Sequence, residues 1–344
     1  MKYITYSITI LSFILMSTLP INAASRHGNS SKKVMMTTFT VTNTNDSGVG
    51  SLRQAILDTN ANAGNDVIEF NIGGGGAHSI DLLSDLPIFT EGLSVDGSTQ
   101  PGYSGTPLIS VGSNWSGNVF NANANAPFIF DGLNIGKIGA AGGSSVNINL
   151  GASLVITNCQ ITNRQYGVLT NSCPIVTITD NDFSNSGISG GWALYLSGIT
   201  TSAVINGNTL TGATNGIKLI SCTNLTIGAT SGDIQVGNQL KEVFFPLEVI
   251  GGSNITISNI DFGKTASGGA QLNLSTVTGI TVTNCIVTNR SYGLIFSSCS
   301  NVVATNNNLS DSGVSGGVCS LSQCQYRNFK CNRQYLWRIN HPSH

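Results

Sequence analysis

Two carboxylates lie two positions apart in the segment Thr179-Asp180-Asn181-Asp182. Side chains at this spacing point the same way on a strand. Cleavage of a glycosidic bond needs two carboxyl groups at a defined separation, and carboxylate oxygens are also preferred ligands of Ca²⁺. Asp180 and Asp182 are therefore the candidate catalytic pair or Ca²⁺ site of this chain.

A second copy of the motif weakens that interpretation. Asn306 and Asn308 replace the two aspartates there, as a structural turn would allow, and we favour the structural role. The pair Arg164 and Arg290 and the pair Lys137 and Lys264 also repeat. An active site is normally single, so duplicated cations indicate turn or stacking elements. Apart from Ca²⁺ at the aspartate pair, no metal or cofactor is predicted.

The elements that position these residues form a long internal duplication. Residues 157–191 and 283–317 align without a gap at an offset of 126 and share 19 of 35 residues. A shorter period of 22 to 30 residues lies inside it. Its markers are apolar residues in short β-rich segments: Ile156, Ile178, Ile205, Ile227, Ile257 and Val282.

A period in the low twenties, with strands separated by Gly, Asn and Ser turns, predicts a β-solenoid. The fold class is all-β, a right-handed parallel β-helix whose coils each hold three short strands and three turns. Ile, Val and Leu would stack inside, and Asn in the turns would adopt left-handed backbone and ladder its amide between coils. Leucine-rich repeats and β-propeller blades have sequence patterns that are absent here.

The cysteines follow the same repeat. Cys159 recurs as Cys285, and Cys173 recurs as Cys299, while Cys222 has no counterpart. Their spacing matches no zinc pattern. We expect these five thiols to be small buried core residues that form no disulfides.

The N-terminal region has three predicted parts. Residues 1–23 have the pattern of a secretory signal peptide, with a positive start, an apolar run and small residues at its end. Residues 24–36 are expected to form a flexible leader. Residues 37–110 hold the cap and first coils: Ser51 caps an amphipathic helix that runs to about Asn60, and this helix would cover the open apolar end of the solenoid.

The segments TVTNTNDSGVGSLRQAILDTNANAGNDVIEFNI and LPIFTEGLSVDGSTQPGYSGTPLI resemble the start of large secreted bacterial right-handed β-helix proteins, including those with a CSLREA-type start. The resemblance covers about residues 37–110, and looser repeats continue to 317. It implies an exported or cell-surface protein with an adhesive role, and marks the fold more strongly than the function.

Two functions are expected from these observations. The first is adhesion or binding of polysaccharides or cell-surface glycans without catalysis. The alternative is a polysaccharide lyase or glycoside hydrolase of the β-helix type, similar to a pectate lyase. The formal net charge of −1 excludes a basic nucleic-acid surface, and no stretch has the length of a transmembrane helix.

The composition changes after Gly317. The 111–317 region carries the duplicated β-helix, whereas residues 318–344 hold three cysteines and no β pattern. A reading of possible codons shifted by one base restores the repeat, so we interpret the tail as frameshifted. The alternative is a genuine cysteine-bearing cap. The last coil would then lack its final strands, and its uncapped apolar end would favour end-to-end self-association.

Overall fold

The structure is a computed structural model. It describes residues 36–113, 117–136, 142–229, 237–265, 269 and 272–312, and the main chain of 320–322 and 325–326. The predicted signal peptide and nearly all of the predicted leader lie outside these residues, as do Lys137 and most of the predicted tail.

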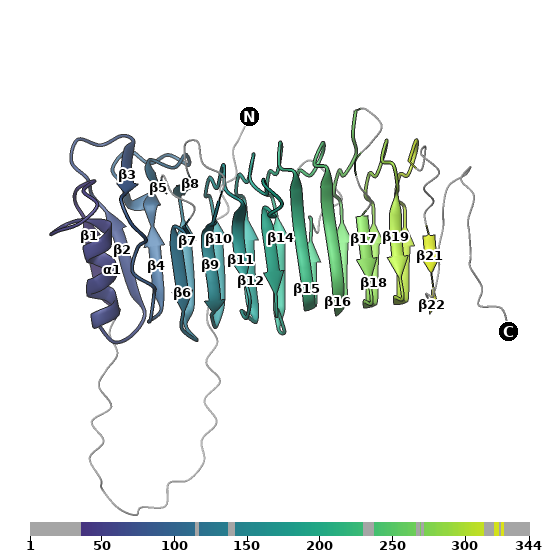
Figure 1. Cartoon of the computed structure of the whole chain (residues 1–344), viewed down its shortest axis with the longest axis horizontal. Coiled ribbons are helices and arrows are strands. Elements are labelled where there is room, and N and C mark those ends of the chain that lie inside the picture. Colours follow the sequence, from purple (N-terminus) through teal and green to yellow (C-terminus); the bar gives the residue numbers. More distant parts are fainter. Residues whose placement is uncertain are drawn as a thin grey trace, which may run out of the picture. The chain divides into compact units, whose positions relative to one another are not determined.

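The described residues form a parallel β-solenoid with one short helix (Figure 1). Strands of successive coils lie side by side and pair in parallel, which gives three stacks. Stack A contains β1 Thr38–Val41, β2 Asp66–Phe70, β4 Leu93–Asp96, β7 Pro127–Asp131, β10 Ser153–Thr157, β12 Ile175–Thr179, β14 Ser202–Asn206, the second halves of β15 Asn215–Ile227 and β16 Phe245–Ser258, β18 Thr278–Thr283, β20 Ser300–Thr305 and β22 Gln325–Tyr326.

Stack B forms the second face of each coil. It contains β6 Phe120–Asn123, β9 Ser144–Leu150, β11 Tyr166–Thr170, β13 Leu194–Ser197, the first halves of β15 and β16, β17 Leu272–Ser275, β19 Leu294–Ser297 and β21 Ser320–Ser322. Stack C starts with β3 His78–Leu82, β5 Ile109–Ser113 and β8 Leu133–Gly136. It continues as single bridges from Asn134 through Gln160 and Asp182 to Asn308. The expected three-sided coil is confirmed.

The register of the coils agrees with the period in the sequence. Ile156 pairs with Ile178, and the same series of partners continues without a slip to Val282. All six marker side chains are fully buried. Alternate residues of a strand point to opposite faces, so each marker stacks on the next inside the solenoid.

The helix α1 Leu52–Ala61 lies at the N-terminal end of the described solenoid and packs against β1 and β2 (Figure 1). The Ser51 side chain accepts a hydrogen bond from the Gln54 amide at 3.2 Å, which caps the first turn. Its buried face consists of the predicted positions: Leu52, Ala55, Ile56 and Thr59. The prediction of a short capping helix is confirmed.

Asparagines shape the turn between stacks A and C. Asn158 and Asn284 have φ of 52° and 54°, in the left-handed region that Asn tolerates. Further along the turn, the buried side chains of Asn181, Asn208 and Asn238 form an internal ladder. Each Nδ2 donates to a main-chain carbonyl of the preceding coil, at 2.9 Å, 2.8 Å and 2.7 Å respectively. The predicted amide ladder is present.

The five cysteines of the repeat region are buried and form no disulfide. Desolvation by burial raises the pKa of Cys159 and Cys285 to about 12 and that of Cys173 to about 11. The prediction of core thiols is confirmed.

This burial makes the thiols unreactive. We expect alkylation of the five cysteines at about pH 8 to be slower by about two orders of magnitude in the folded protein than in denaturant, because the thiolate is both scarce and covered. Peptide mass mapping after timed iodoacetamide treatment measures each site. Rapid labelling of Cys159 or Cys285 before unfolding would contradict the core assignment.

Two short strands correct the expectation for the tail. The main chain of β21 pairs with β19, and that of β22 pairs with β20, so both stacks continue past Gly317. The identity of the remaining tail as a frameshift stays a prediction. In the part of the chain that the structure describes, no helix combines the length and the apolar character that crossing a bilayer requires.

Candidate functional site

The structure places Asp180 and Asp182 on a turn. Strand β12 ends at Thr179, and Asp180 follows it with φ of 59° and an exposed side chain. Asp182 is half-buried on the third face, where its Oδ1 accepts a hydrogen bond from the Ser184 amide at 2.9 Å. The side chain of Asn181 between them points into the core ladder.

Asp180 lies close to the next coil. A Cβ at Gly207 would approach the Asp180 carboxylate to 2.1 Å, so a larger residue there would require the Asp180 side chain to move. The side chain of Asp180 is exposed overall, but the part of the protein around its carboxyl desolvates it enough to raise its pKa. Among the described residues, no group of three or more His, Cys, Asp or Glu side chains is arranged to hold a metal ion. The left-handed φ of Asp180 is shared by its repeat equivalent Asn306 at 58°, which is what a turn position requires.

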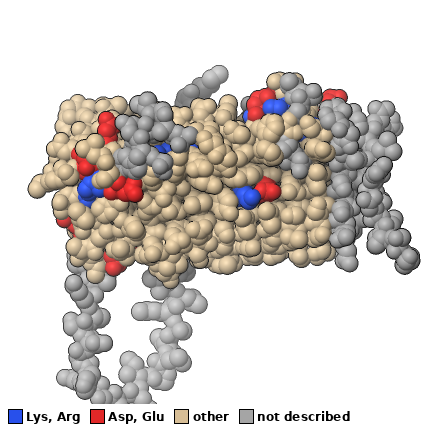
Figure 2. Space-filling model, viewed as in Figure 1, with Lys and Arg blue, Asp and Glu red and all other residues tan. Residues whose placement is uncertain are grey.

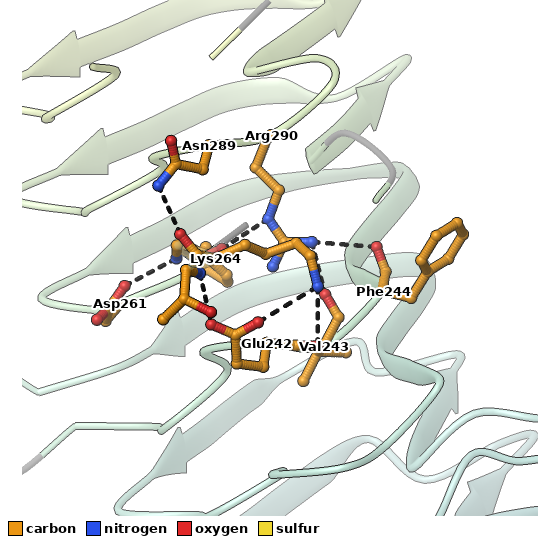
Figure 3. Close-up of polar contacts among 10 residues, drawn as sticks. Glu242, Val243, Phe244, Asp261, Lys264, Asn289 and Arg290 are labelled. Atoms are coloured by element: carbon orange, nitrogen blue, oxygen red, sulfur yellow. Dashed lines mark hydrogen bonds and ion pairs between the residues drawn. The ribbon is translucent and has the colours of Figure 1, made fainter. Parts of the chain in front are cut away.

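The duplicated arginines are buried. Arg290 is fully buried and donates to three main-chain carbonyls of two preceding coils: Phe262 at 2.7 Å, Val243 at 2.5 Å and Phe244 at 3.1 Å (Figure 3). Burial lowers the pKa of Arg290 to about 10, and the charges of Glu242 and Asp261 oppose that shift. The guanidinium thus ties three coils together.

Arg164 has the same role in the first copy. It is fully buried, and its Nη2 donates to the carbonyls of Gly117 and Ser144. Beside Arg290, the Lys264 ammonium pairs with the Glu242 carboxylate at 3.4 Å (Figure 3). These contacts agree with a structural role for Arg164, Arg290 and Lys264, whereas Lys137 lies outside the described residues.

A different set of residues forms the most site-like feature, on the outward side of stack B. Tyr195, Lys218, Glu248 and Asn273 are successive register partners on four neighbouring coils. The Lys218 Nζ lies 2.7 Å from Glu248 Oε2, 5.4 Å from the centre of the Trp192 ring and 6.0 Å from that of Tyr195. A cation at these distances is attracted by the ring faces.

A cavity of about 230 Å³ opens beside this row. It is lined by Trp192, Asn215, Phe245, Leu247, Glu248 and Asn273. We call it the Trp192 cavity. It combines two aromatic rings with amides and one carboxylate, the chemistry of a site that binds a molecule with both apolar and hydroxyl surfaces.

The sequence-based reasoning missed this cavity. One signal was available, because Lys218, Glu248 and Asn273 each follow a buried apolar residue by one position. Aligning the coils on those inward residues would have placed the three polar side chains in one outward row.

Charged side chains cover only a small part of the face shown in Figure 2, and most of its surface is uncharged. This matches a chain in which charged residues make up 9 % of the composition. The chemistry of the described surface therefore depends mainly on amides, hydroxyls and aromatic rings.

Comparisons with known proteins extend this description. No family model matches the chain. The chain is 27 % identical over 123 residues to an Aspergillus terreus protein named "Probable pectate lyase C". The aligned part makes up 36 % of this chain and 26 % of that protein, so the chain spans about a quarter of the relative's length. In sum, the chain is a parallel β-solenoid with a distant, partial similarity to a protein named as a pectate lyase.

Proposed function

We propose that this chain acts on a polysaccharide, as a lyase of the β-helix type that cleaves uronic-acid polymers. The similarity to the protein named pectate lyase C carries the proposal. The Trp192 cavity supports only the polysaccharide part of the proposal, because it lies on a row of outward side chains that crosses several coils; the uronic-acid substrate is argued from the similarity alone. Eliminative cleavage needs a general base near the sugar and a cation that neutralises the uronic carboxylate.

The test is release of unsaturated sugars. The full chain is incubated with polygalacturonate, alginate and other uronic polymers, with and without Ca²⁺, and the ultraviolet absorbance of the new double bond is followed. We expect product from at least one polymer. Absence of product from all of them would overturn the lyase proposal.

The same experiment also tests whether Asp180 and Asp182 take part in catalysis. The double variant Asp180→Asn, Asp182→Asn resembles the second repeat copy, so it is expected to fold normally. Because both residues occupy a turn, we expect its product release to stay within about threefold of the parent, less than the roughly hundredfold that loss of an acid–base catalyst causes. A loss of that larger size would assign catalysis to the pair.

A second candidate function is glycan binding or adhesion without catalysis. It is favoured by polar ladders on the outer faces. Asn123, Asn149 and Asn171 are joined by side-chain hydrogen bonds of 3.2 Å and 3.1 Å across neighbouring coils. Saturable binding to immobilised polysaccharides without product release would select this function. In either case we propose a secreted or cell-surface location, which rests on the predicted signal peptide.

A further inference from the structure

The Trp192 cavity has a chemistry that selects among sugars. We infer that it is a binding subsite for one uncharged sugar residue of the bound polysaccharide, a neutral unit beside the uronic units, and that it does not itself hold a uronic-acid unit. The inference rests on the proposed polysaccharide function but concerns only the ligand of this cavity. Three features of the described residues carry it: the ring-lined wall, the hydrogen-bonding groups and the neutral charge balance.

The wall presents aromatic surface to the cavity. Phe245 is 42 % exposed, and Phe244 packs edge-on against it with ring centres 4.8 Å apart. Trp192 lines the same cavity. Asn215 pairs with Phe245 of the following coil, and the register of stack B places Asn215 level with Trp192 of the preceding coil. One face of a pyranose ring carries only C–H groups, and such a face packs well on an aromatic ring.

The polar groups fit hydroxyls. Glu248 accepts from Lys218 through Oε2 and from Asn273 Nδ2 through Oε1, the latter at 3.4 Å. The Asn215 Nδ2 donates to the Gly191 carbonyl at 2.6 Å, which holds its amide in place. Carboxylates accept hydrogen bonds from sugar hydroxyls, and side-chain amides both accept from them and donate to them. A hydroxyl group can take part in both ways, because it donates one hydrogen bond and accepts others.

The charge balance argues against an anionic unit. Glu248 is the charged residue in the cavity lining, and the Lys218 ammonium beside it neutralises its carboxylate at 2.7 Å. A uronic carboxylate would have to separate this half-buried pair or lie beside the Glu248 carboxylate. Both carry an electrostatic cost that a neutral sugar avoids.

The size of the cavity limits the ligand. Its volume of about 230 Å³ is below the roughly 300–1,000 Å³ typical of pockets for drug-sized ligands. A single sugar ring therefore fits, and the rest of a polymer would lie along the outward row of stack B.

Calorimetric titration of the full chain tests the inference. The probes are neutral oligosaccharides of glucose, xylose and galactose, and oligogalacturonides and alginate oligomers of matched length. We expect saturable binding of at least one neutral series, tighter than that of any acidic series. Trp192→Ala should weaken it by about tenfold through the loss of ring stacking. The control Ile175→Ala, at an exposed apolar position on stack A, should bind like the parent.

Two further variants test the charge balance. Lys218→Met should keep neutral-sugar affinity within about threefold. Glu248→Gln frees the Lys218 cation and should raise the affinity for acidic oligomers at least about tenfold. Tighter binding of acidic than neutral oligomers by the parent, no binding of any neutral series, or no effect of Trp192→Ala would overturn the inference. The lyase proposal is judged separately, because product release from uronic polymers is measured without reference to this cavity.

Discussion

Replacing Arg290 by methionine lowers the free energy of unfolding by about 2–4 kcal/mol, since three carbonyls, two of them in buried hydrogen bonds, lose their donor. The carbonyls of Phe262, Val243 and Phe244 belong to two coils; the bonds to Phe262 and Val243 are buried and the bond to Phe244 is partly buried. Burial of the guanidinium costs desolvation energy, which is also what lowers the pKa of Arg290. Methionine avoids this cost, so the loss of stability is smaller than the sum of three hydrogen bonds.

Chemical denaturation and hydrogen exchange measure the effect together. Coils of a solenoid can unfold in separate steps, so exchange of the amides in β16 and β19 shows whether the loss is local. Arg290→Lys should remain destabilised, because an ammonium lacks the planar fork that reaches several carbonyls at once. The control Tyr292→Ser changes an exposed side chain two residues away and should alter stability by less than about 0.5 kcal/mol. A methionine variant as stable as the parent would show that the arginine does not brace the coils.

Replacing Asn208 by leucine lowers the free energy of unfolding by about 3 kcal/mol or more. The Asn208 Nδ2 donates to the carbonyls of Ile178 and Asn206 and to the Asn238 Oδ1, and its Oδ1 accepts from the Asn181 amide. Leucine has a similar volume but can form none of these hydrogen bonds, and a buried group that loses its partner costs about 1–3 kcal/mol. The loss is measured by denaturant titration.

A matched external asparagine is the control. The Asn171 side chain is exposed, and its Nδ2 bonds to Asn149 Oδ1 at 3.1 Å. Asn171→Ala should change stability by less than about 0.5 kcal/mol, because water replaces the lost partner. Equal effects of the two substitutions would contradict the distinction between internal and external ladders.

The variant Asn208→Asp gives this comparison a pH signature. Burial would raise the pKa of the new carboxyl in the folded state above its value in the unfolded chain. The unfolded state then binds fewer protons over that pH interval, so stability rises as pH falls through the folded pKa. We expect the aspartate variant to regain part of its stability in acid, and the leucine variant to show no such recovery. Parallel pH profiles would contradict an interior position.

The positions of the strands were predictable because their causes are local. The inward markers from Ile156 to Val282 alternate with outward residues, and left-handed Asn, Asp or Gly residues follow them, so period and register agree with the structure. The capping helix was predictable for the same reason: Ser51 and its apolar spacing lie within ten residues of each other. The short strands after Gly317 were missed, because that segment has no alternation to mark them.

The sites depended on contacts between coils. The sequence shows that Arg164 and Arg290 repeat, but only the packed turns reveal that both guanidinium groups are buried against carbonyls of other coils. Asp180 and Asp182 are near neighbours in sequence, yet the turn after β12 sends the Asn181 side chain between them into the core.

By itself, the sequence determined the solenoid, its three-sided coils, its register and its N-terminal cap, because alternation and turn residues act within a few positions. The tertiary structure alone decided the Trp192 cavity. Lys218, Glu248 and Asn273 are separated by 25 to 30 residues and meet only because successive coils stack in parallel. Loops of unequal length obscure that alignment in the sequence, and the stacking of strands restores it.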